Sequence, residues 1–191
     1  AYEQAKASRD ITRLNSTQSG SSLLDTKNQA LNTIYSSYTT LDDAIRGKTD
    51  VAYSDARFES IKLLLSISDA QLTFSLETKR KAIEQMLLAR DTQNKVLTVN
   101  DDLMAELTVV QSEVQLVKSY LDDLFSAYSK ALQNGAQTQT SLDAGKVITQ
   151  TARQSVGATL SGVIGARSSL SSSITAKEVA GSVTTEAAGS L

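Results

Sequence analysis

The chain has 191 residues with a formal net charge of −2, and it contains no proline, cysteine, histidine or tryptophan. Since proline breaks helices, its absence favours long helices. Without histidine and cysteine, the chain lacks the commonest general base, the thiol nucleophile and the usual transition-metal ligands. We therefore expect no catalytic residues, no cofactor and no metal site. Because the charge is balanced, no basic field gathers phosphate groups, and we expect no nucleic-acid binding.

Aliphatic side chains dominate the hydrophobic residues, which make up 40% of the chain, whereas only 5% of residues are aromatic. This composition suits helix seams better than a sheet sandwich. We predict an all-α protein, an elongated antiparallel helical bundle or coiled coil of three to five helices. No stretch has the roughly 18 consecutive apolar residues that a membrane-spanning helix needs. Ala1 is not a methionine and no leader pattern follows, so we expect a processed product or a fragment.

Residues 1–22 are predicted to form a short helix and a polar linker. Ala5, Ile11 and Leu14 have helical spacing, and the cap and turn formers of residues 15–22 then break the pattern.

Residues 23–134 are predicted to form a coiled-coil-like helical bundle. A heptad pattern opens it and ends at Gly47, a residue that favours a helix stop. The core positions of this first pattern are Leu24, Leu31, Ile34, Tyr38, Leu41 and Ile45. A second helix is expected from about residue 51 to residue 97, with Thr49 or Asp50 as its cap. An eleven-residue repeat predicts that this helix is nearly straight, and its members are Ile61, Leu65, Leu72, Leu76, Ile83 and Leu87.

The clearest pattern lies in a third predicted helix, which starts within residues 98–102 and ends at residues 134–135. Eight aliphatic or tyrosine residues follow each other at alternating steps of four and three, the spacing of a coiled-coil face. We predict that they form the helix-packing seam, namely Leu103, Leu107, Val110, Val114, Val117, Leu121, Leu124 and Tyr128. Met104, Phe125 and Leu132 widen this face, so we expect the helix to touch more than one neighbour.

A further helix, rich in glycine, alanine, serine and threonine, is predicted to pack on the bundle over residues 135–176, with Thr140 as its cap and Asp143 completing a capping box. Its apolar residues keep helical spacing, and they are Ile148, Ala152, Val156, Leu160, Val163, Leu170 and Ile174. Residues 177–191 are expected to form a flexible tail.

Three glycines in this region, Gly157, Gly162 and Gly165, let another helix or subunit approach closely, so we predict a close-packing segment around them. The same small and uncharged segment could instead insert into a membrane interface after a rearrangement. That alternative is less favoured, because interfacial helices usually carry aromatic anchors.

The adjacent aspartates of the sequence are predicted to mark helix starts or to lie on the solvated surface. Neighbouring residues of a helix point about 100° apart, so adjacent aspartates cannot converge on one ion. The pairs in question are Asp42–Asp43, Asp101–Asp102 and Asp122–Asp123. The basic run of residues 79–81 is flanked by Glu77 and Glu84 and is expected to face solvent in the same way.

The composition resembles that of the helical parts of flagellin-type filaments, of exported secretion-apparatus subunits and of phage structural proteins. We expect a non-enzymatic structural or assembly subunit that acts through helix packing, as a homo-oligomer or with a helical protein partner. Two alternatives are a membrane-active protein of the pore-forming or translocator type and a coiled-coil adaptor. An extracellular, secreted or virion-associated location is slightly favoured over the cytoplasm.

Overall fold

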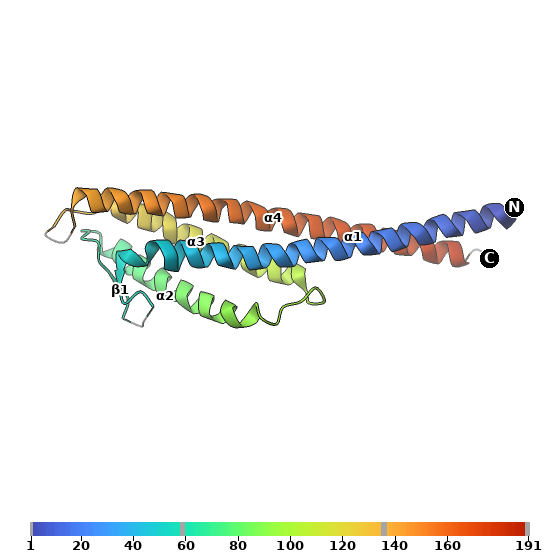
Figure 1. Ribbon diagram of the computed structural model, residues 1–191, viewed down its shortest axis with the longest axis horizontal. Helices are drawn as coiled ribbons and strands as arrows, with labels where there is room; N and C mark the ends of the chain where they lie inside the picture. The colour runs from blue at the N-terminus through green and yellow to red at the C-terminus, as the bar shows by residue number, and fades with distance from the viewer. Residues whose placement is uncertain (1, 58–59, 135–136, 190–191) are drawn as a thin grey trace.

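The computed structural model describes residues 2–57, 60–134 and 137–189. Four long helices pack against each other in this described part, namely α1 (Tyr2–Asp42), α2 (Ala70–Gln93), α3 (Leu103–Lys130) and α4 (Gln139–Gly189). The molecule is elongated, α1 and α4 run antiparallel along its length, and both ends of the chain lie at the same end (Figure 1). The predicted all-α helical bundle is confirmed, because helices make up most of the described residues.

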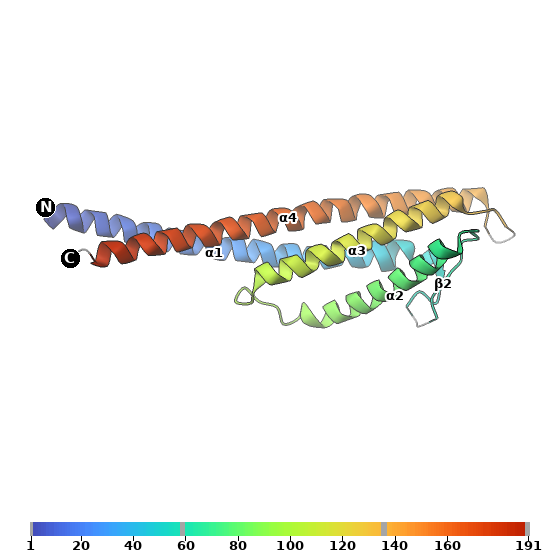
Figure 2. The ribbon, with the colours of Figure 1, turned by 180° about the vertical axis from the view of Figure 1, so that it is seen from behind.

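The α2 and α3 helices form a hairpin that lies along only one part of the α1–α4 pair (Figure 2). The connection between α2 and α3 is tied to α1 by two hydrogen bonds. Lys27 Nζ donates to Val99 O at 3.1 Å, and Tyr35 Oη donates to Leu97 O at 2.8 Å. The molecule is therefore a four-helix bundle on one side of this connection and a two-helix structure on the other.

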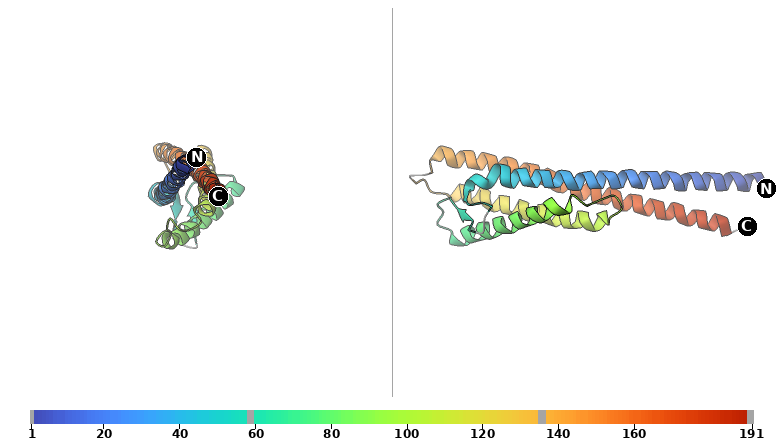
Figure 3. Two further views of the ribbon diagram at one scale, coloured as in Figure 1. Left: turned by 90° about the vertical axis from the view of Figure 1, so that its right-hand side faces the viewer. Right: turned by 60° about the horizontal axis from the view of Figure 1, so that its bottom comes forward.

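We call the two-helix part the arm, and we define it as α1 before Ala30 together with α4 after Leu170. The two helices of the arm extend well beyond the α2–α3 hairpin (Figure 3). Ala30 and Leu170, which border it, are each only 1% exposed. By contrast, none of the arm side chains that the structure describes is buried. The hydrophobic core thus ends where the hairpin ends.

The α3 helix is the centre of the four-helix part. All eight residues of its predicted seam are buried, and so are Tyr120 and Ala127 of the same helix. The helix begins after Asp102, whose side chain accepts a hydrogen bond from Ala105 N at 3.1 Å. It contacts α1, α2 and α4, as its wide apolar face predicts. Because burial of one large aliphatic side chain contributes about 1.5–3 kcal/mol, this helix supplies much of the stability.

Most other residues that the sequence predicts as core are buried as well. On α1, α2 and α4 these are Ile34, Tyr38, Leu41, Leu76, Ile83, Leu87, Ala152, Val156, Val163 and Leu170. Leu24 is 51% exposed because it belongs to the arm. Ile148 is 39% exposed near the start of α4, at the end of the molecule opposite the arm. The periodic pattern therefore identifies the inward faces but not the point along α1 where the core begins.

The predicted break of the first helix at residues 15–22 is wrong, because α1 continues without interruption from Tyr2 to Asp42. Two side chains of this stretch bond to carbonyl groups of the preceding helical turn instead of capping a helix end. Thr17 Oγ1 donates to Arg13 O at 3.0 Å, and Ser21 Oγ donates to Thr17 O at 3.3 Å.

The second predicted helix begins about 20 residues later than expected. Residues 43–52 continue the chain as a π-helical segment, η1 (Asp43–Thr49), and a 3₁₀ turn, η2 (Asp50–Ala52). A short ribbon of β1 (Tyr53–Ser54) and β2 (Lys62–Leu63) follows, in which Tyr53 pairs with Leu63. Ile61 and Leu65 are buried, as helical spacing predicts, but from this non-helical segment.

The actual cap of α2 is Asp69, which accepts a hydrogen bond from Leu72 N at 3.0 Å. Gly47 does not stop a helix, since it lies inside η1, and neither Thr49 nor Asp50 caps α2.

The boundaries around α4 also differ from the prediction. The α3 helix ends at Lys130, and the predicted stop at Gly135 lies outside the described residues. Thr138, not Thr140, caps α4, because its Oγ1 accepts a hydrogen bond from Ser141 N at 3.2 Å. The predicted tail after Lys177 is helical as far as Gly189.

The α3 seam generates a first prediction. Val114→Asp places an unpaired charge among aliphatic side chains, since Val114 is 0% exposed, and we expect the free energy of unfolding to fall by more than about 3 kcal/mol. Val109→Asp is the matched control in the same helix, because Val109 is 45% exposed, and its effect should stay below about 1 kcal/mol. Urea unfolding followed by circular dichroism measures both. Equal effects of the two substitutions would show that this face is not the core.

Candidate functional site

The three glycines of the predicted close-packing segment have open space around them within the chain. A Cβ atom added at Gly157, Gly162 or Gly165 would meet nothing within 4 Å, so no other part of the chain requires a glycine at these positions. Close packing against another subunit stays a prediction. Gly145 of α4 differs, because no side chain fits at this position. An added Cβ would overlap the ring of the seam residue Tyr128.

A cluster of ion pairs lies inside the four-helix part, between the end of α1, η1, η2 and α2. Arg80 is 0% exposed and donates hydrogen bonds to Asp50 Oδ1 at 2.6 Å and to Glu84 Oε2 at 2.9 Å. Glu84 Oε1 also accepts a hydrogen bond from Arg46 Nη2 at 2.6 Å, and Arg46 donates to Asp42 at 2.8 Å. The cluster fastens the irregular segment after α1 to α2.

This cluster corrects the prediction that residues 79–81 form a solvated basic run. Adjacent residues of a helix point about 100° apart, so only Arg80 faces the core. Lys79 lies at the edge and donates a hydrogen bond to Asp123 at 2.7 Å, while Lys81 is exposed.

The charged form of Glu84 is favoured by its two arginine partners. Burial alone would raise the pKa of its carboxyl group, because a carboxylate loses solvation inside a protein. The hydrogen bonds from Arg46 and Arg80 outweigh this effect, so the pKa of Glu84 lies below its ordinary value of 4.5. Glu84 therefore stays ionised at neutral pH and acts as an acceptor between the two guanidinium groups.

A second ion cluster joins α1, α2 and α3. Arg90 Nε donates to Glu113 Oε1 at 3.0 Å, and its Nη1 donates to Glu106. The guanidinium group lies 5.0 Å from the centroid of the Tyr38 ring, and the Tyr38 hydroxyl donates to Glu113. Burial and the bond to Glu113 both raise the pKa of Tyr38. The tyrosine therefore remains protonated and serves as a fixed donor between helices.

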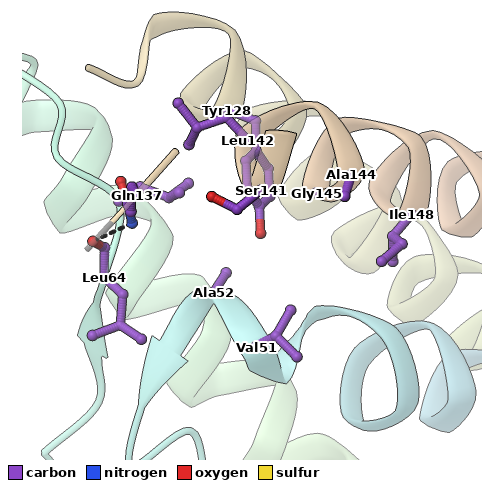
Figure 4. A pocket seen from close by; sticks show the side chains of 11 residues that line it. Val51, Ala52, Leu64, Tyr128, Gln137, Ser141, Leu142, Ala144, Gly145 and Ile148 are labelled. Carbon is purple, nitrogen blue, oxygen red and sulfur yellow. Dashed lines mark hydrogen bonds between the residues drawn. The ribbon is translucent and has the colours of Figure 1, made fainter. Parts of the chain in front are cut away.

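A cavity of about 410 Å³ lies where the start of α4 meets residues 51–65 (Figure 4). Aliphatic side chains make up much of its wall. Its polar groups already hold the chain together, since Gln137 Nε2 donates to Leu64 O at 2.7 Å and Ser141 Oγ donates to Thr138 O at 2.8 Å. Tyr128 is the titratable residue of this wall, and burial raises its pKa. The cavity therefore lacks a pair of acid and base groups.

The aspartate pairs of the sequence point to separate partners, as expected. Arg153 donates to Asp122 at 2.7 Å, whereas Asp123 accepts from Lys79. Across the described residues, no group of three or more His, Cys, Asp or Glu side chains is placed to hold a metal ion. Over the same residues, no helix is both long enough and apolar enough to cross a membrane.

Sequence reasoning missed the two buried arginines, although the sequence carries a signal for them. Leu76, Arg80, Ile83, Leu87 and Arg90 follow each other at steps of four, three, four and three. This is the spacing of the α3 seam, with arginine in two of the core positions. Tyr120 was also missed, and it is fully buried against Tyr53 with 6.4 Å between the ring centroids.

Comparisons with models of protein families, with curated proteins and with solved structures find no match to this chain. The buried polar clusters connect helices within the chain, and the cavity offers few free polar groups. The arm differs from both, because its described side chains remain at least partly exposed along two long helices. It is therefore the candidate functional surface of the molecule.

The buried arginine generates a second prediction. Arg80→Met removes one partner of a buried cluster and leaves Asp50 and Glu84 with less compensation, so we expect a loss of about 3 kcal/mol or more in the free energy of unfolding. Lys81→Met, the exposed neighbour, should change it by less than about 0.5 kcal/mol. Chemical unfolding measures the two values, and a large effect at Lys81 would contradict the assignment.

The lowered pKa of Glu84 generates a third prediction. A carboxylate whose pKa is lower in the folded state contributes stability above its unfolded pKa, and this stability is lost as the pH falls through the folded pKa. Between neutral pH and 4.5 its contribution should therefore be present, and below 4.5 it should decline. Glu84→Gln removes this titration, so its stability should depend less steeply on pH below 4.5. Parallel stability curves for the two proteins would contradict the assignment.

Proposed function

We propose that the chain is a non-enzymatic structural or assembly subunit that packs its helices against helices of other chains, in a homo-oligomer or with a helical partner. The arm carries this proposal. Its two helices extend beyond the α2–α3 hairpin, and none of their described side chains is buried. Because most helices in proteins depend on tertiary packing of one face, the arm gains the most from helices that another chain supplies.

The contacts inside the arm support this view. The two helices meet there through small polar side chains, such as Thr26 and Ser173, whose hydroxyl oxygens lie 3.0 Å apart. Several larger apolar side chains of the arm stay outside this contact. Ile11 is 60% exposed, Leu14 is 68% exposed and Val179 is 58% exposed. These side chains remain free to be buried against further helices.

The polar groups of the four-helix part support the non-enzymatic half of the proposal. Arg80, Glu84 and Arg90 are all engaged in ion pairs that join different segments of the chain. Their partners hold the carboxylates ionised and the guanidinium groups fixed. They serve to position helices, and we assign them no role in chemistry.

The proposal predicts that the purified chain associates. Sedimentation velocity over a wide range of protein concentrations should show a mass that rises above the monomer value. Open-ended growth would identify a filament component, and a closed oligomer would identify a particle component. A chain that stays monomeric at every concentration and recruits a helical partner in fixed ratio would be an adaptor instead.

The membrane-active alternative has its own measurement. Dye release from liposomes by the purified chain, lost in Gly162→Asp while the helix content is kept, would contradict the assembly proposal. We expect no dye release.

A further inference from the structure

A groove without charged residues runs between α1 and α4. Three hollows follow each other along it, from the arm to the beginning of the four-helix part. On α4 its lining residues are spaced at alternating steps of three and four, and they include Gly162, Gly165, Ser169, Ser172, Ala176 and Val179. The α1 side shows the same spacing from Thr12 to Thr33. Both walls therefore present a regular helical face.

The groove lies on the face of the α1–α4 pair that the α2–α3 hairpin leaves uncovered. The hairpin side is marked by Lys27, which bonds to Val99 O, and by Arg167, which bonds to Gln111 on α3. Two positions along a helix correspond to about 200° of rotation. Gln29 and Gly165 are two positions from Lys27 and Arg167, so they point to the opposite face.

The groove shares one feature with the core of a protein interface, the absence of charge. None of the residues that line the three hollows is charged, whereas 21% of the chain is charged. Depletion of charge marks the centre of protein interfaces. The glycines have open space where a Cβ would lie, and small residues of this kind let helix backbones come close together. Gly162 and Gly165 thus find a use outside the isolated chain, whereas Gly157 does not line the three hollows.

We propose that a second copy of this chain occupies the groove, so that two copies pair groove against groove. This inference rests on the proposed assembly function and names its surface. A two-fold interface brings the same patch of both copies together, and an uncharged patch meets itself without repulsion between like charges. The groove also continues the α1–α4 contact, so pairing adds a second pair of helices to the arm.

The available area suffices for a specific dimer. The 21 helical steps from Thr12 to Thr33 extend over about 32 Å, and two helices side by side are about 20 Å wide. The face therefore measures roughly 640 Å² per copy, or about 1,300 Å² for both. Specific interfaces bury more than about 1,000 Å² in total.

A glycine-to-glutamate pair of variants tests the surface. Gly165→Glu places a charge in the groove, while Gly20→Glu places the same charge on the arm outside the groove. Both glycines lie within helices and have open space at Cβ. Since glutamate favours a helix more than glycine does, both variants should fold. We expect Gly165→Glu to weaken dimerisation by about a hundredfold or more, and Gly20→Glu by no more than about threefold.

Thiol reactivity gives a second, local readout, because the chain has no cysteine of its own. Ser172 in the groove and Ser112 on α3 are both exposed, and each hydroxyl bonds to the carbonyl four residues earlier. In Ser172→Cys the reaction with maleimide should slow by about tenfold at protein concentrations where the wild type is dimeric, because interface cores exclude water. In Ser112→Cys the rate should not change with concentration.

The outcomes separate the surface from the assembly proposal. If the wild type associates but Gly165→Glu does so equally well, or if Gly20→Glu has the larger effect, the groove is not the contact and the assembly proposal stands. A wild type that remains monomeric at every concentration and binds no other helical protein overturns both. Association of the wild type only with a different helical protein overturns the second copy as the occupant.

Discussion

The burial of one face of α3 is the interaction on which the rest of the molecule depends. Ten of its side chains are buried, and they contact the three other helices. The α1–α4 pair has a hydrophobic core only where α3 covers it. Beyond the N-terminal end of α3, the same two helices continue with partly exposed serine, threonine and small apolar residues. The contrast between the two halves follows from the reach of a single 28-residue helix.

The first of the two ion clusters solves a problem that this packing creates. The segment between α1 and α2 leaves the helical path, and an aliphatic contact alone would hold it with little directionality. Arg80 and Arg90 occupy positions where an aliphatic residue would continue the seam of α2, and their guanidinium groups reach carboxylates on neighbouring segments. Planar guanidinium groups make directional hydrogen bonds. Buried ion pairs of this kind help to fix which segments meet, even where their net contribution to stability is small.

The sequence predicts the inward faces of the helices well and the ends of the helices less well. The seam from Leu103 to Tyr128 is visible because aliphatic side chains repeat over many turns. The start of α2 is not visible, because the helical spacing begins at Ile61 and Leu65 in a segment that is not helical. Serine and threonine mark caps and turns by propensity, yet along α1 they bond to their own helix. Tertiary contacts with α4 decide between these two uses, and the spacing of one chain segment does not reveal them.

The sequence predicts that small residues of α4 form a helix contact, but it does not predict that this surface lies between α1 and α4. Gly157, Gly162 and Gly165 indicate a helix contact through their small size, but within the chain an added Cβ at these positions would meet nothing within 4 Å. Gly162 and Gly165 form a groove together with Thr26, Gln29 and Thr33 of α1, which lie more than 120 residues earlier in the sequence. The buried positions of Arg80 and Arg90 could have been read from their spacing, if charged residues had been allowed at core positions.

The pairing of α1 with α4 also has a consequence for how the chain folds. Thr26 and Ser173, which meet in the arm, are 147 residues apart, so closing the intervening loop before any other structure forms carries a large entropic penalty. Docking of α2 and α3 shortens that loop, after which α1 and α4 can zip together outward from Ala30 and Leu170. The arm is then the last region to form and the first to open. Its backbone amides should accordingly exchange with solvent through local fraying rather than global unfolding.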